Sequence, residues 1–241
     1  MVNVISPATT GAAACRGFER ASQPACFASR ADLRGLVPLD VRLRTSHAEA
    51  LAQLLPLLLC GEESAALAFT QFAELARLDG DARAQLSRVR FEEERHEAWL
   101  TRLRLGLPAP KPDRGLRRIV RHFFLTIREP EVGAHLGRIA SLDSAVCVIL
   151  GALRHPRCAL AADADLRRLL TRIQFDEAGH SRTASYYARI FGASDLRWLA
   201  IDTRERLARL IALRAVAFDQ VGVCPDRLSR RLLRVPRRLF V

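Results

Sequence analysis

Lysine and methionine are nearly missing from this sequence. Lys111 is the only lysine among 38 basic residues, and Met1 is the only methionine among 241 residues. Lys111 does not follow the glycine spacing of a phosphate-binding loop, and neither Gly-x-Gly-x-x-Gly nor Gly-x-Ser-x-Gly occurs. The chain therefore lacks the motifs of P-loop NTPases, of Rossmann-type dinucleotide-binding proteins and of α/β-hydrolases.

Cysteine pairs are also lacking. No two of the six cysteines form a Cys-x-x-Cys pair, which argues against a zinc ribbon and against a disulfide framework. The six are Cys15, Cys26, Cys60, Cys147, Cys158 and Cys224.

The sequence has neither a secretory signal nor a long uninterrupted apolar run. Its start, MVNVISPATT, has no basic segment followed by an apolar core. The longest apolar runs, at residues 54–60 and 145–153, are much shorter than the roughly 20 residues that cross a bilayer. We therefore expect a cytoplasmic protein that does not enter the membrane.

Charge is abundant but unbalanced. The formal net charge is +12, carried almost entirely by arginine. The simplest interpretation is a solvated basic surface whose arginine content reflects a GC-rich genome. A positive surface also fits an acidic carrier protein, a phosphorylated substrate or RNA as a partner.

The chain length favours one main domain with a single sizeable core. Residues 1–44 are rich in Ala, Ser, Arg and Pro without lasting periodicity, which predicts a flexible or loosely packed extension. Residues 45–192 carry the strongest helical patterns. Residues 193–241 predict a further helix and a basic tail that pack on the main domain.

Helical periodicity dominates, and alternating strand patterns are nearly absent, so the fold class is predicted to be all-α. Ser46 and Glu49 predict a capping box, Asp81 predicts a helix N-terminus, and Pro130 predicts the first residue of another helix. The expected long helices span residues 46–78, 81–106, 130–153, 163–190 and 194–221, with a short amphipathic helix at residues 114–127. The first four long helices predict a bundle with a crossover between the second and third.

Two Glu-x-x-His pairs lie on apolar helix faces. Glu177 and His180, in FDEAGHSR, fall on a stripe with Leu166, Ile173 and Ala184. Glu93 and His96, in FEEERHEAW, fall on a similar stripe. A buried unpaired charge is costly, so these side chains need a partner or a metal. One such pair is common by chance, but a second copy favours a metal site.

The other two long helices each place one acid on the apolar face. Glu62 shares its face with leucines and phenylalanines, whereas its neighbour Glu63 shares a face with polar residues, so Glu62 is the preferred candidate. Asp143 lies on the apolar face of the expected 130–153 helix. All four helices of the expected bundle therefore carry inward acids.

The order Glu, Glu-x-x-His, acid, Glu-x-x-His resembles that of the ferritin-like diiron carboxylate proteins. The separations, 31 positions from Glu62 to Glu93 and 34 from Asp143 to Glu177, are similar to those of ribonucleotide reductase small subunits and bacterial multicomponent monooxygenases. The resemblance covers about residues 46–190. It implies a ferritin-like four-helix bundle with additional C-terminal helices.

The resemblance also implies a ligand set for two iron ions, with a manganese and iron pair as the alternative. Carried over by position, Glu62, Glu93 and His96 would bind one metal, and Asp143, Glu177 and His180 the other. Glu93 and Glu177 would bridge the metals and take part in catalysis. Most related families have glutamate where this chain has Asp143, so this shorter acid would bind one metal terminally or through water.

Missing residues narrow the resemblance. With Met1 as the only methionine, the methionine-ligated haem of bacterioferritin is unavailable, and the rubredoxin-type cysteine pairs of rubrerythrin are missing. Leu100 stands where a radical tyrosine is expected, and Ile173 stands where arylamine N-oxygenases carry an extra histidine. An O2-activating oxygenase or oxidase is therefore favoured, with a ferroxidase or iron store and an RNA-directed hydroxylase as alternatives.

The favoured function implies further partners. An external electron donor, such as a reductase or ferredoxin, would reduce the irons, and O2 would be the co-substrate. The substrate would be a small molecule or one bound to an acyl carrier, and hydroxylation, N-oxygenation or desaturation would be its reaction. Cys147 stands where related monooxygenases often place a threonine beside the oxygen pocket, or it is a small core residue. The amphipathic helix expected at residues 194–221 could pack on its own bundle or on a second copy, so a homodimer is one hypothesis for the oligomeric state.

Overall fold

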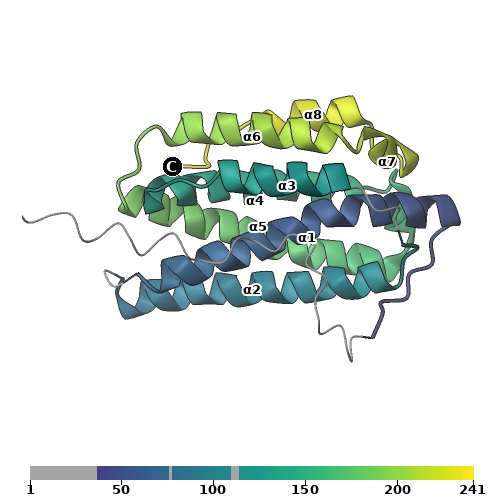
Figure 1. Ribbon diagram of the computed structural model, residues 1–241, viewed down its shortest axis with the longest axis horizontal. Helices are drawn as coiled ribbons and strands as arrows, with labels where there is room; N and C mark the ends of the chain where they lie inside the picture. The colour runs from purple at the N-terminus through teal and green to yellow at the C-terminus, as the bar shows by residue number, and fades with distance from the viewer. Residues whose placement is uncertain (1–36, 76–77, 110–113) are drawn as a thin grey trace, which may run out of the picture.

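The computed structural model describes residues 37–75, 78–109 and 114–241, and these residues form helices and connecting segments without any strand (Figure 1). The prediction of an all-α fold is therefore confirmed. Of the predicted N-terminal extension, residues 1–36 lie outside the described residues. Residues 37–44 are not helical, and they are attached where Leu39 N donates to the Arg102 carbonyl and Arg42 N donates to Asp163.

Four long helices build the centre of the molecule. They are α1 (Thr45–Ala73), α2 (Gly80–Leu105), α4 (Val132–Leu153) and α5 (Ala164–Ile190). The most extensive packing joins α1 to α2 and α4 to α5, and α2 also contacts α5. Each helix begins and ends within a few residues of its predicted bounds, because each carries an apolar stripe of period 3.6 that is buried in the core.

The helix N-termini are only partly as predicted. Asp163 caps α5 by accepting a hydrogen bond from Leu166 N, as its position before the helix indicates. The cap of α2 is Asp79, which accepts from Ala82 N, and not Asp81. The predicted capping box of α1 is wrong, because the helix begins one residue before Ser46 and Arg44 occupies the N-cap without a side-chain hydrogen bond.

The shorter helices cover the outside of the four long ones. α3 (Arg114–Thr126) lies in the connection from α2 to α4, and it contacts α1 and α6. The predicted single helix at residues 194–221 is wrong: the chain forms α6 (Leu196–Ala212) and α7 (Ala215–Gln220), followed by α8 (Pro225–Leu232). α6 and α8 pack on α4, whereas α7 packs on α1.

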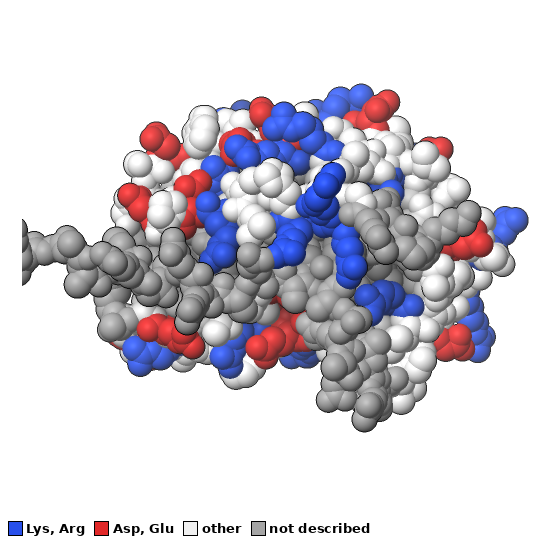
Figure 2. Space-filling model, in the orientation of Figure 1, with Lys and Arg blue, Asp and Glu red and all other residues white. Residues whose placement is uncertain are grey.

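Charged side chains lie on the surface, with a group of basic ones near the centre of the face in Figure 2. Figure 1 shows α3 in the middle of this face. Arg118 and Arg121 of α3 are exposed, whereas Val120, Phe123 and Phe124 of the same helix are buried. The amphipathic pattern therefore turns one face of α3 to the core and leaves its arginines in water.

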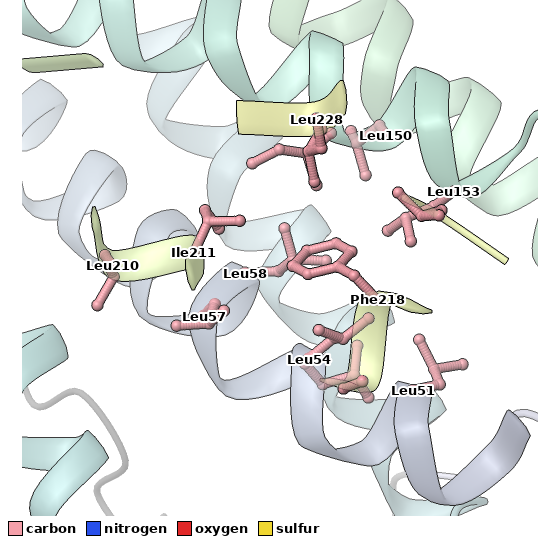
Figure 3. Packing of buried hydrophobic residues seen from close by; sticks show 14 of the residues in the cluster. Leu51, Leu54, Leu57, Leu58, Leu150, Leu153, Leu210, Ile211, Phe218 and Leu228 are labelled. Carbon is pink, nitrogen blue, oxygen red and sulfur yellow. The ribbon is translucent and has the colours of Figure 1, made fainter. Parts of the chain in front are cut away.

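The buried apolar residues form two clusters, and the larger one is seen from close by in Figure 3. On α1, α2 and α5 a candidate metal ligand lies between the residues of the two clusters, and on α4 Asp143 lies within three residues of both. On α2, for example, Leu100 belongs to the larger cluster and Val89 to the smaller one, and His96 lies between them. The core is thus divided by a buried polar layer that all four long helices supply.

Two helices, α1 and α4, are long and apolar enough to cross a membrane by length and composition. Their most apolar windows are 56% and 72% buried inside the protein, which is typical of core helices. Glu62 interrupts the apolar sequence of α1 and Asp143 that of α4, so neither helix contains a long uninterrupted apolar run. Apolar composition of this kind is weak evidence for a membrane span.

Candidate metal centre

The polar layer contains all six residues that the sequence singled out as metal ligands. Glu62 comes from α1, Glu93 and His96 from α2, Asp143 from α4, and Glu177 and His180 from α5. None has more than 4% of its surface exposed. Helical phase therefore identified the inward side chains, and Glu63, the alternative to Glu62, is only half-buried.

Four of these residues form a compact group. One ligand atom from each of Glu93, His96, Glu177 and His180 lies within 4.8 Å of the others, so a metal ion fits among them. His180 Nδ1 is 2.8 Å from Glu93 Oε1 and 3.7 Å from Glu177 Oε1. His96 Nδ1 is 3.4 Å from Glu177 Oε1 and 4.0 Å from Glu93 Oε2. Both glutamates thus lie close to both histidines, as bridging carboxylates must.

Glu62 and Asp143 extend the group toward α1 and α4. Glu62 Oε2 is 3.1 Å from His96 Nδ1. His96 is the histidine with which the resemblance to diiron proteins grouped Glu62. Asp143 lines the same cavity as Glu62, Glu93 and Glu177, and its Oδ2 has no hydrogen-bond partner. The structure thus brings all six predicted ligands to one place.

Several atoms of the group are buried without a hydrogen bond. They include Glu93 Oε1 and His180 Nδ1, which are close together but not aligned for a hydrogen bond. Glu177 Oε1 and Asp143 Oδ2 are also without a partner. Buried polar atoms are normally paired, and such exceptions indicate a missing ion or ligand. The donor set of carboxylate oxygens and imidazole nitrogens therefore fits a bound metal.

Each histidine is held from behind by an acid of the facing helix. His96 Nε2 lies 3.1 Å from Asp176 Oδ2, and His180 Nε2 lies 2.9 Å from Glu92 Oε2. An Nε2–H group that donates to a carboxylate leaves the Nδ1 lone pair for a metal, the arrangement common to metal-binding histidines. Both imidazoles are thus oriented with Nδ1 toward the four inward carboxylates.

The outer acids are themselves bound by arginines. Asp176 accepts from Arg95 of α2 at 3.2 Å and from Arg172 of α5 at 3.1 Å. Glu92 accepts from Arg88 at 3.2 Å. These ion pairs reach from the buried histidines to the surface, where the three arginine side chains are 41–79% exposed.

The same nine-residue pattern produces both halves of this arrangement. RVRFEEERH begins at Arg88 and RIQFDEAGH begins at Arg172, and both have the form Arg-x-x-Phe-acid-Glu-x-x-His. In each copy the arginine bonds the acid four residues later, one turn along the helix, and the acid bonds the histidine of the other copy. The two copies, one on α2 and one on α5, therefore make matching contacts and give the site an approximate two-fold symmetry.

Sequence reasoning missed the role of the outer acids. Helical phase considers one helix at a time, and it assigned no role to Glu92 or Asp176. The signal was present in the nine-residue repeat, because an acid stands before the glutamate in both copies.

Burial and mutual repulsion change the proton affinity of the group in the absence of metal. Burial raises the pKa of Glu93, Asp143 and Glu177, and repulsion from neighbouring carboxylates raises each further. Burial disfavours protonation of His96, but hydrogen bonds to Glu177 and Glu62 outweigh it and raise the pKa of His96 to about 10. Protons thus replace part of the positive charge that a metal would supply.

The outer acids shift the other way. Burial alone would raise the pKa of Asp176, but its hydrogen bond with His96 and the charge of Arg172 outweigh burial and lower it. The pKa of Glu92 is lowered for the same reason, by hydrogen bonds with His180 and Arg88. Both outer acids therefore stay ionised and continue to accept from the histidines.

Cys147 lies one turn after Asp143 on α4, but its thiol faces α5. Its Sγ donates to the Gln174 carbonyl oxygen at 3.6 Å, and Gln174 Nε2 donates back to the Cys147 carbonyl at 2.9 Å. Burial and the nearby carboxylates raise the pKa of the thiol to about 12, so it is neutral. Val146, and not Cys147, lines the cavity that adjoins the inward carboxylates. A catalytic role for Cys147 stays a prediction.

A narrow cavity adjoins the carboxylates. Glu62, Glu93, Asp143 and Glu177 form one side of it, and all its other walls are apolar. These walls come from α1, α3, α4 and α6: Leu57, Leu58, Gly61, Ala65, Phe124, Leu142, Val146, Ile149, Leu207, Leu210 and Ile211.

No family model, curated protein or solved structure matches this chain in the three comparisons. The proposed function therefore rests on the geometry of the candidate ligands, on the hydrogen bonds of the outer acids and on the cavity.

Proposed function

We propose that the protein is a ferritin-like, non-haem diiron enzyme that activates O2 to oxidise its substrate. The observation that carries the proposal is the orientation of the two buried histidines. Each has Nε2 bound to an acid of the facing helix and Nδ1 within 4.0 Å of both Glu93 and Glu177. Four inward carboxylates from four helices complete the set.

The donor chemistry supports iron. Four carboxylates and two imidazoles amount to one nitrogen for each of two metals, and such oxygen-rich sites suit iron or manganese better than zinc or copper. Glu62 and His96 would hold one metal, Asp143 and His180 the other, and Glu93 and Glu177 would lie between them. We propose an iron pair, with a manganese and iron pair as the alternative metal content.

When bound, the metal pair would supply the redox chemistry with O2, using electrons from an external donor. The chain itself has three tasks. The inward acids hold the positive charge in a dry site, the outer acids fix the imidazole tautomers, and the apolar walls exclude water from the reacting region. Each task is met by residues already described.

The cavity favours an enzyme over an iron store. Its outer walls are leucine, isoleucine, valine and phenylalanine side chains, which do not replace the water shell of an entering iron ion. An organic substrate with apolar parts gains by entering the same space. A ferroxidase that passes iron onward is therefore the weaker of the two functions.

The partners follow from this function. The enzyme needs an electron-transfer partner, such as a reductase or ferredoxin, because O2 activation consumes electrons that the chain does not supply. The substrate is a small molecule or one carried by an acidic acyl carrier, which the net charge of +12 would attract. An RNA-directed activity is a further hypothesis that the basic surface allows, and a homodimer is one that the amphipathic C-terminal helices allow.

The first prediction concerns the bridging glutamates. Glu93→Ala and Glu177→Ala are expected to keep their helical circular dichroism but to lose about two irons per chain and all O2 consumption, because each glutamate would contact both metals. Iron is counted by elemental analysis after anaerobic ferrous reconstitution. Glu94→Ala, which removes an exposed acid beside Glu93, is the control and should retain both irons. Full iron content in both test variants would contradict the proposal.

A further inference from the structure

The cavity beside the carboxylates is a slot and not a round chamber. Its volume is only about 40 Å3, so its walls lie close together. Its α1 wall runs from Leu57 to Ala65, which at a rise of 1.5 Å per residue is a length of about 12 Å. The slot is therefore long in one direction and slim across it.

The slot lies between α1 and α4, with α6 on its outer side. Figure 3 shows Leu57 and Leu58 of α1 facing the α6 residues Leu210 and Ile211. Phe124 of α3 closes another part of the wall. Among the lining residues that the structure describes, none has a side chain with a hydroxyl, an amide or a positive charge. A ligand in the slot therefore finds no hydrogen-bond partner except at the carboxylate side.

We infer that this slot binds a linear aliphatic chain, so that the substrate class is a molecule carrying an unbranched alkyl group. The inference rests on the proposed function, which supplies the oxidising centre along the inner side of the slot. An alkyl chain matches the apolar walls, and its small cross-section matches their close spacing. A polar chain would not match the apolar walls, and a ring would be too wide for their close spacing.

Gly61 offers a way to test the width of the slot. It lines the cavity on α1, and a Cβ added there would lie 3.8 Å from the ring of Phe124, an ordinary van der Waals distance. Gly61→Ala therefore narrows the slot without a clash, and alanine is the better helix former. Loss of ligand binding in this variant would not be a consequence of lost stability.

The test uses the full chain without metal and a series of n-alkanols from butanol to dodecanol, measured by isothermal titration calorimetry. Affinity should rise about fourfold for each added methylene until the slot is full, and then level off. Gly61→Ala should bind the longer alkanols about fourfold more weakly, since it removes room for about one methylene. Gly80→Ala is the control, because nothing lies within 4 Å of the added methyl group.

Three results would overturn the inference. They are an affinity that does not depend on chain length, equal binding of cyclohexanol and hexanol, and equal effects of the Gly61 and Gly80 variants. Because the test needs no metal, its failure is separate from failure of the proposed function. Iron loading without chain binding would remove only the substrate class, and chain binding without iron loading would remove only the diiron enzyme.

Discussion

Asp176 and Glu92 decide which nitrogen of each histidine faces the inward carboxylates. Without them, either ring nitrogen of His96 or His180 could carry the proton, and either ring could rotate. With them, both Nδ1 atoms point to Glu93 and Glu177. At the scale of single residues, the candidate centre therefore depends on two acids that contact it through its histidines.

Asp176→Asn tests this dependence. An asparagine can keep the size of the side chain but weakens the hydrogen bond from His96 and the ion pairs with Arg95 and Arg172. We expect metal affinity to fall roughly 10–100-fold, the usual effect of changing a partner of a metal-binding histidine. The affinity is measured by anaerobic competition with a chelator, using ferrous iron.

Asp165→Asn is the matched control for this variant. Asp165 lies on the same helix and also pairs with an arginine, Arg168, but it is exposed and far from the histidines along α5. The Asp165→Asn variant should bind ferrous iron with the same affinity as the unchanged protein. Equal affinities for all three proteins would show that Asp176 has no positioning role.

Sequence reasoning succeeded for the inner residues and failed for the outer ones for one physical reason. Helical phase relates each residue to the apolar face of its own helix, and Glu62, Glu93 and Glu177 lie on that face. Asp176 and Glu92 face a neighbouring helix instead. A single helix pattern contains no information about which partner stands beside it.

At the scale of helices, one buried arginine links α6 to α8 and to α4, the helix that carries Asp143. Arg204 of α6 is fully buried and donates to the carbonyl oxygens of Leu232 and Arg234 and to Ser144 Oγ on α4. Burial lowers the pKa of Arg204 to about 10, so it stays charged near neutral pH. Ser144 follows Asp143, so this contact lies directly beside a candidate ligand.

Arg204→Met should lower the stability of the metal-free protein. Methionine fills similar space but leaves one buried carbonyl, one partly buried carbonyl and a hydroxyl without their donor, at a cost of about 2–3 kcal/mol in the free energy of unfolding. Urea unfolding followed by circular dichroism measures this change. Arg206→Met, on the same helix but with its arginine pairing near the surface with Asp202, should cost less than about 1 kcal/mol. Equal costs would contradict the role given to Arg204.

The break between α6 and α7 shows the limit of helix prediction. The apolar pattern continues through residues 194–221, so local sequence favours one helix. In the structure the helix ends at Ala212, and Ala217 and Phe218 are buried in the core through packing of α7 on α1. Tertiary packing overrides local propensity here. Among the long helices, α2 and α5 begin at acids that the sequence displays, Asp79 and Asp163, whose side chains accept hydrogen bonds from helix amides.

At the scale of the whole molecule, two electrostatic effects oppose each other as pH rises. The chain carries a formal charge of +12 near neutral pH, and deprotonation reduces this self-repulsion, which by itself favours the folded state. The buried site acts in the opposite direction. Its carboxyl groups and His96 have raised pKa values in the folded state, so the folded protein binds more protons than the unfolded chain.

The buried site should therefore make the metal-free protein lose stability, relative to the iron-loaded protein, as pH rises. For His96 the loss falls between pH 6.5, its ordinary pKa, and its folded pKa of about 10, and the raised carboxyl groups add loss above their ordinary values. Thermal denaturation at several pH values measures this slope. The iron-loaded protein should not show it, because metal charge replaces the protons. Parallel curves for the two forms would contradict the electrostatic account of the site.

The central claim is that two irons occupy the layer formed by α1, α2, α4 and α5. It is tested most directly by elemental analysis of the protein as purified and after anaerobic ferrous reconstitution, with the ultraviolet and visible spectrum recorded as O2 enters. The account predicts about two irons per chain and a transient absorption band on oxygenation. Failure to bind iron would reduce the cluster to a structural feature of a helical protein. Iron in large excess of two per chain would identify a store and contradict the proposed enzyme.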